Sequence, residues 1–356
     1  MRTLVATAGV LGALAAGLIV HGANLADACA GLIGSNGAVN LGRTTTLAGY
    51  HDGVEHYITA FEFQGGGGQF GSLIPLPGIP TNVERGGDWT LQRLERETQQ
   101  AQAFGAAGGG VGGPVSAGAT VLQEVRIDAL DLTVLSGGGP DVAVWAEQHG
   151  FRLSPDAPEV LDFYAARSPI FLAAVFDSGA AAERGQQLGD GTPVHITIPV
   201  DNPWVPLRIL GLGKQAEDFI QADVYLLTDD KPAILPDLGN GLFPAYDQPA
   251  SELLLNDLRA DTGMGWVPES GWLTKLVVSS ATKDLRYDLA VDTTDARDPS
   301  RVAAGLEAPL VRALPFTGVA DSGDGRPIPF VAVIAAAVLI LIAALVVGLR
   351  PTWDRR

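Results

Sequence analysis

The chain has 356 residues, a mildly positive mean hydropathy of +0.21 and a formal net charge of −17. A protein this acidic repels phosphate backbones, which excludes nucleic acid as an expected partner. The single cysteine, Cys29, excludes an intrachain disulfide and a multi-cysteine metal site, so burial has to stabilise the fold.

The N-terminus has the pattern of a secretory signal. A basic residue at position 2 precedes an uncharged apolar run, and Ala26-Asp27-Ala28 gives the small–x–small pattern of a cleavage site. We expect residues 1–28 to be removed by cleavage between Ala28 and Cys29. An uncleaved anchor and lipidation of Cys29 stay open as alternatives, although Ala26 and Asp27 fit a lipobox poorly.

The first half of the middle region predicts a hairpin, an interrupted strand and a helix. Residues 44–63 are rich in β-formers around Asp52-Gly53, a strong two-residue turn signal. A strand at 70–79 contains prolines, so we expect it at a sheet edge or a bulge. Asp88 is the expected N-cap of a helix that begins at Trp89 and runs to about residue 104.

The remaining elements alternate between strands and short helices without strict β-α-β order. We expect strands at 121–135 (one long strand or a pair), 170–176, 194–200, 207–212 and 222–227, and a hairpin from 273–279 and 285–291. Helices are expected at 140–149, 155–167 and from Ser251 to about residue 259. This order predicts an α+β domain at 29–295, with mixed, mainly antiparallel sheets and several short helices.

The C-terminal region predicts one membrane helix. The twenty residues from Phe330 to Leu349 carry no charge, and a helix of that length spans a hydrocarbon core of about 30 Å. The arginine-rich tail at 350–356 should stay cytoplasmic, which places the N-terminal bulk outside the cell membrane. Residues 296–329 are the expected flexible tether.

A short motif in that tether offers a second mode of attachment. Leu314, Pro315, Phe316, Thr317 and Gly318 resemble the LPxTG sorting signal of Gram-positive surface proteins. The resemblance implies that a sortase cuts after the threonine and joins it to the cell wall. The polar stretch 319–329 departs from the usual pattern, and a Pro-Gly turn in a linker is the alternative, so both a retained helix and wall attachment stay open.

Four segments together resemble the exported bacterial proteins of domain-of-unknown-function family 2330. They are FGSLIPLPGIPT at 70–81, GGDWTL at 86–91, SPIF at 168–171 and NPWVPLR at 202–208. The resemblance covers roughly 29–290 and implies a shared fold and an exported location. It implies no catalytic residues.

The densest cluster of metal-capable groups lies in the predicted hairpin. In a two-residue hairpin His51 pairs with Val54 and His56 with Gly49, so both histidines share one face. A zinc site would need a third ligand from His149, His195 or a carboxylate. The alternative is a plain polar hairpin tip. We predict no cofactor, because the GxGxxG match at 108–113 lacks the strand and helix of a dinucleotide site, and P-loop and GxSxG patterns are absent.

The sequence favours a non-enzymatic binding or structural module of the cell envelope, with a protein or glycan ligand, over an enzyme. Abundant carboxylates allow an alternative, an envelope hydrolase with two acids about 5–10 Å apart in a cleft. Two facing acids in a cleft, or a carboxylate with a raised pKa, would favour the hydrolase. An accessory subunit of a membrane complex is a further alternative.

Overall fold

The computed structural model describes residues 31–34, 37–38, 43–62, 70–99, 119–186, 191–239 and 241–309. The expected signal peptide, the sorting motif at 314–318 and the apolar run from Phe330 to Leu349 lie outside the described residues. Among the residues described, no helix is both long enough and apolar enough to cross a membrane.

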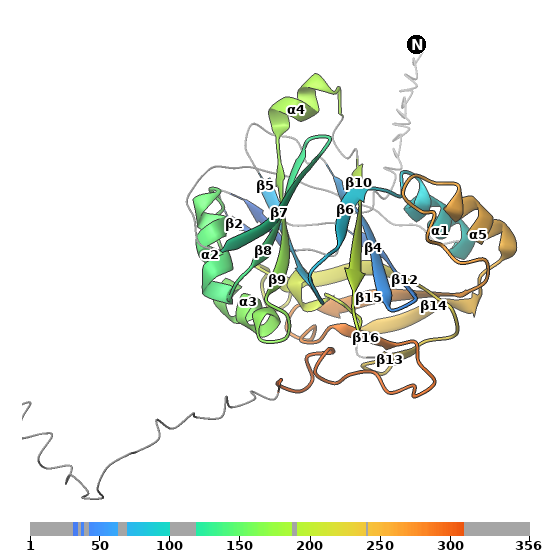
Figure 1. The fold of residues 1–356 in the computed structure, drawn as a ribbon. Helices are drawn as coiled ribbons and strands as arrows, with labels where there is room; N and C mark the ends of the chain where they lie inside the picture. The colour runs from blue at the N-terminus through green and yellow to red at the C-terminus, as the bar shows by residue number, and fades with distance from the viewer. Residues whose placement is uncertain are drawn as a thin grey trace, which may run out of the picture. The chain divides into compact units, whose positions relative to one another are not determined.

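Two sheets face each other, and helices cover their outer faces (Figure 1). The seven-stranded sheet has the order β14-β15-β12-β3-β4-β10-β6, with bounds Leu242–Pro249, Trp272–Ala281, Phe219–Thr228, Arg43–His51, Val54–Glu62, Gly191–Pro199 and Asn82–Arg85. The six-stranded sheet has the order β2-β1-β5-β9-β8-β7, with bounds Gly37–Ala38, Gly31–Gly34, Phe70–Leu76, Ile170–Phe176, Leu130–Ser136 and Thr120–Ile127. Neighbouring strands run antiparallel except β3 and β12 among the described pairs, which confirms the expected α+β class.

The alternation of side chains along each strand creates the layers. In β9, Ile170 and Leu172 enter the core between the two sheets, whereas Phe171 and Ala173 pack on the outer face. Because both faces of such a strand are covered, its sequence is almost continuously apolar. The same alternation in β12 sends Val224 between the sheets.

Two helices cover each outer face (Figure 1). Helices α2 (Gly139–Gln148) and α3 (Ala157–Ala165) pack on the six-stranded sheet, and α1 (Thr90–Thr98) and α5 (Glu252–Arg259) pack on the seven-stranded sheet. The short α4 (Ser178–Glu183) follows β9. The cap predicted for α5 is confirmed, because Ser251 Oγ accepts a hydrogen bond of 3.2 Å from the backbone N–H of Leu254.

The expected start of α1 at an Asp88 cap is wrong. Trp89 occupies the N-cap position, and no side chain caps the helix. The Asp88 carboxylate instead pairs with Arg85 at 2.7 Å and accepts a hydrogen bond of 2.9 Å from Thr262 Oγ1. Asp88, which we expected to cap α1, therefore links the loop before α1 to the loop after α5.

The predicted hairpin at 44–63 is confirmed as β3 and β4, with positive φ angles at Asp52 and Gly53 in the turn. Strand β5 differs from expectation, because it lies between β1 and β9 and not at an edge. Among the described residues, β1 pairs with residues 70–73, so the described partner strand of Pro75 is β9. A proline, which lacks the N–H for a second ladder, is tolerated at such a position.

The C-terminal part of the fold holds three further differences. The expected strand at 207–212 is a 3-10 helix, η1 (Arg208–Gly211). The expected second hairpin does not form, because β15 belongs to the large sheet and β16 (Leu289–Asp292) pairs with β11 (Trp204–Val205) and β13 (Ala233–Leu235). Of the expected tether, residues 296–309 are described, and Ala303 and Ala304 among them are buried in the fold.

Candidate functional site

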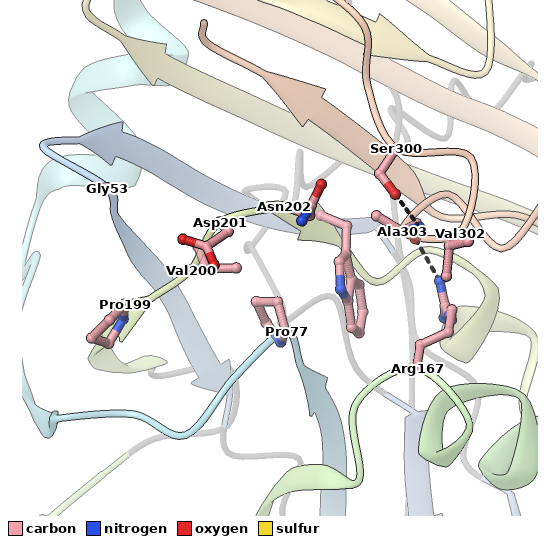
Figure 2. Close-up of a pocket in the computed structure, with 11 residues that line it drawn as sticks. Gly53, Pro77, Arg167, Pro199, Val200, Asp201, Asn202, Ser300, Val302 and Ala303 are labelled. Atoms are coloured by element: carbon pink, nitrogen blue, oxygen red, sulfur yellow. Dashed lines mark hydrogen bonds between the residues drawn. The ribbon is translucent and has the colours of Figure 1, made fainter. Parts of the chain in front are cut away.

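A hollow of about 660 Å3 opens beside the turn of the β3–β4 hairpin (Figure 2). Its wall is formed by Gly53 in that turn, Pro77 after β5, the segment 199–202 after β10, and the turn at 300–303. Four segments far apart in the sequence therefore meet here.

One residue that lines this hollow, Arg167, belongs to a buried ion pair. The Arg167 side chain is only 4 % exposed, and its Nη2 donates to Asp288 Oδ2 at 2.5 Å. Its Nη1 donates to the carbonyl of Ala303 at 2.5 Å, as Figure 2 shows, and its Nε to that of Phe163 at 3.3 Å. The guanidinium also lies 4.7 Å from the ring centroid of Trp204. Three of the five N–H groups of Arg167 are thus used, and two remain.

Asp288, the partner of Arg167 in this ion pair, is itself held by several hydrogen bonds. Its Oδ1 accepts hydrogen bonds from the Tyr164 hydroxyl at 2.8 Å and from the backbone N–H groups of Leu207 at 2.7 Å and Arg208 at 3.0 Å. The carboxylate is fully buried, and each of its oxygens is satisfied. A buried charge with this many partners fixes the geometry of the groups around it.

The rim carries polar side chains that the protein itself leaves unbound. Asp201 and Asn202 are exposed, and neither side chain makes a hydrogen bond in the described part of the chain. A carboxylate only accepts hydrogen bonds, whereas an amide both donates and accepts them. Pro77, Pro199 and Val200 supply the apolar part of the wall.

The two histidines singled out by the sequence share one face of the hairpin, with the pairing expected for a two-residue turn. They do not form a metal site. His51 Nδ1 lies 2.7 Å from Asp229 Oδ1, whereas His56 Nδ1 lies 2.9 Å from His195 Nε2. His149 stacks on Trp145 in α2. No group of three metal-capable side chains occurs in the described residues.

The His56–His195 pair is uncharged at neutral pH. Burial, together with the nearby His195 and His51, lowers the pKa of His56 to about 3. Burial also lowers the pKa of His195, although Glu84 Oε1, at 3.4 Å from its Nδ1, opposes the shift. One neutral imidazole therefore donates its N–H to the other.

Glu55 has a strongly shifted pKa but lies outside any site. It precedes His56 in β4, so its side chain enters the opposite face, between the sheets, and is fully buried. Burial raises its pKa well above the usual value, an effect that the neighbouring Tyr50 hydroxyl partly opposes. A raised carboxylate pKa would suit a general acid, but no polymer substrate reaches the interior of this core.

Arg167, Asp288, Asp201 and Asn202 are not among the site residues expected from the sequence. A usable signal was present, because two of the four family-like segments line this hollow and a third begins directly after Arg167. Pro77 lies in 70–81, Arg167 directly precedes 168–171, and Trp204 lies in 202–208.

Comparison with known proteins gives one family. The profile described as "Uncharacterized protein conserved in bacteria (DUF2330)" matches residues 25–234, which is more than half of the chain. The match begins near the expected cleavage site and ends within β13. No curated protein matches the chain.

Solved structures give only a distant likeness. Two structures of a mutated baculovirus P35 after caspase cleavage are 8% identical, with a TM-score of 0.38, and the likeness covers 72% and 71% of this chain and 99% and 100% of theirs. A chain of a caspase-8/P35 complex is 8% identical, with a TM-score of 0.31, over 70% of this chain and 90% of that one. No functional argument follows from likenesses this weak.

Proposed function

The chain belongs to the DUF2330 family of uncharacterised bacterial proteins, and from that premise we propose that it is a surface-anchored, non-catalytic module that binds cell-wall glycan. Residues 1–28 direct export, and the folded unit lies outside the cell. The uncharged run from Phe330 to Leu349 holds the protein in the membrane. Sortase attachment through Thr317 is the second mode of anchoring.

The hollow at the β3–β4 turn carries this proposal. Sugar hydroxyls both donate and accept hydrogen bonds, and the hollow offers Asp201 as acceptor and Asn202 as both. Its volume of about 660 Å3 falls within the usual range of ligand sites. Asp288 holds Arg167, which lines the hollow, in place before a ligand arrives.

The same geometry favours binding over hydrolysis. Glycoside hydrolysis requires two carboxylates on either side of the scissile bond. Among the described residues that line the hollow, Asp201 is the only carboxylate. Glu55, which has the raised pKa, is sealed between the sheets.

Cosedimentation with purified, protein-free cell walls tests the proposal. The full-length protein in maltoside micelles should sediment with the walls, and the double variant Asp201→Ala, Asn202→Ala should bind at least tenfold more weakly, on the order of the loss of two hydrogen bonds. Glu147→Ala, which changes an exposed carboxylate on α2, is the matched control. Equal sedimentation of the double variant, or no sedimentation of the wild type, would contradict the proposal.

A further inference from the structure

A second hollow, of about 710 Å3, lies on the other side of the same hairpin turn. It is lined at the end of β3 by His51, after β12 by Asp229 and Asp230, on α5 by Arg259, and in the loop before β15 by Trp266 and Glu269. It shares no lining residue with the hollow proposed to bind glycan.

An indole ring forms its floor. Trp266 stacks on His56 with ring centroids 4.0 Å apart and an interplanar angle of 1°. The ring also lies over Gly49, where a Cβ atom would be 2.1 Å from Trp266 Cη2. Gly49 and His56 are register partners in β3 and β4, so one face of the indole rests on this rung of the sheet. Trp266 is half-buried and lines the hollow.

The layer behind the indole carries no positive charge. His56 and His195 share a hydrogen bond of 2.9 Å, and burial lowers the pKa of both imidazoles. Two neutral rings therefore support the indole, and neither repels a cation on its other face.

The rim has more negative than positive groups. Arg259 is engaged by the protein, because its guanidinium donates to the carbonyls of Val267 and Pro268 and to Asn256 Oδ1. Asp229 is held by His51 through one carboxylate oxygen.

Two further carboxylates, those of Asp230 and Glu269, face solvent. Neither makes a hydrogen bond or an ion pair within the described part of the chain. The rim therefore offers two exposed, unneutralised negative charges beside the indole face.

We propose that this hollow binds an organic ammonium group, which lies over Trp266 between the carboxylates of Asp230 and Glu269. The face of an indole attracts a cation through its quadrupole, and carboxylates at the rim add Coulombic attraction. An anionic ligand would be repelled by the same carboxylates. A bare metal ion would require several converging ligands, and the described residues contain no such group of three.

Titration with choline tests this site directly. The full-length protein in maltoside micelles is titrated with choline and with its neutral isostere, in which carbon replaces nitrogen. Choline should bind about fivefold more tightly than the isostere, because only the cation gains from the indole face and the carboxylates. The double variant Asp230→Asn, Glu269→Gln should weaken choline binding roughly five- to tenfold and leave isostere binding unchanged.

Two further variants separate binding at this hollow from unrelated effects of the substitutions. Glu147→Gln, an exposed carboxylate on α2, should change neither affinity. Trp266→Leu should abolish the preference for choline, and the exposed-carboxylate variants carry the test if that variant fails to fold. Equal affinity for choline and its isostere, unchanged choline binding in the double variant, or no saturable choline binding would overturn the proposal. None of these results would bear on wall binding through Asp201 and Asn202.

Discussion

At the scale of residues, neighbours on one strand have opposite responses to pH. Glu55 and His56 follow each other in β4, so one enters the core between the sheets and the other faces Trp266. Burial favours the neutral form of each group, which raises the pKa of the acid and lowers that of the base. The two groups therefore destabilise the fold at opposite ends of the pH scale.

Glu55 should make the protein less stable as the pH rises. In the unfolded chain its carboxyl ionises near pH 4.5, while in the folded protein it stays protonated to a much higher pH. Above pH 4.5 the wild type should lose stability relative to Glu55→Gln by up to about 1.4 kcal/mol per pH unit. Denaturant titrations at several pH values measure this difference. The control Glu147→Gln should run parallel to the wild type, and parallel curves for Glu55→Gln would refute the assignment.

His56 should make the protein less stable as the pH falls. The unfolded imidazole takes up a proton near pH 6.5, while the folded one stays neutral down to about pH 3. Between pH 6.5 and 5 the wild type should lose roughly 1 kcal/mol per pH unit relative to His56→Phe, which keeps a ring beneath Trp266. The measurement is the free energy of unfolding against pH. A constant difference between the two proteins would show that folding does not shift the pKa of His56.

At the scale of elements, the sequence correctly predicted structural features that depend on a few consecutive residues. The Asp52-Gly53 turn, the strand at 170–176 and the Ser251 cap each depend on a few consecutive residues, and each is present. The face shared by His51 and His56 also follows from the turn alone.

The side-chain contacts that the sequence did not predict join residues far apart in the chain. His195, from β10, lies 139 positions from His56, and Asp288 lies 121 positions from Arg167. Such a partner leaves no trace in the periodicity of either segment. For the same reason the apolar run at 207–212 resembles a strand, although Asp288 binds the backbone of Leu207 and Arg208 and a 3-10 helix follows.

The Asp288 network joins α3, the start of η1 and the strand β16, and its loss should affect all three. Asp288→Ala leaves Arg167 buried without a counter-charge, which should lower the free energy of unfolding by about 3–5 kcal/mol. Chemical denaturation measures the loss. Asp201→Ala, an exposed residue at the rim of the same hollow, is the control and should change stability by less than about 0.5 kcal/mol. A loss below about 1 kcal/mol in Asp288→Ala would mean that the pair is not buried as described.

At the scale of the whole molecule, four layers of helix, sheet, sheet and helix bury three clusters of apolar side chains without a disulfide. Both hollows flank the turn between β3 and β4, since Gly53 lines one and His51 the other. One short hairpin therefore positions both sites for which we propose ligands.

The proposed function as a surface-anchored module requires that the folded unit lies outside the cell. Protease treatment of intact cells tests this location. The cells produce the full chain with a tag after Arg356, and the protease is added outside. Digestion should remove epitopes within the folded unit, residues 31–309, and leave the tag protected, because the arginine-rich tail stays inside. A folded unit that survives digestion on intact cells but is degraded after lysis would contradict the account.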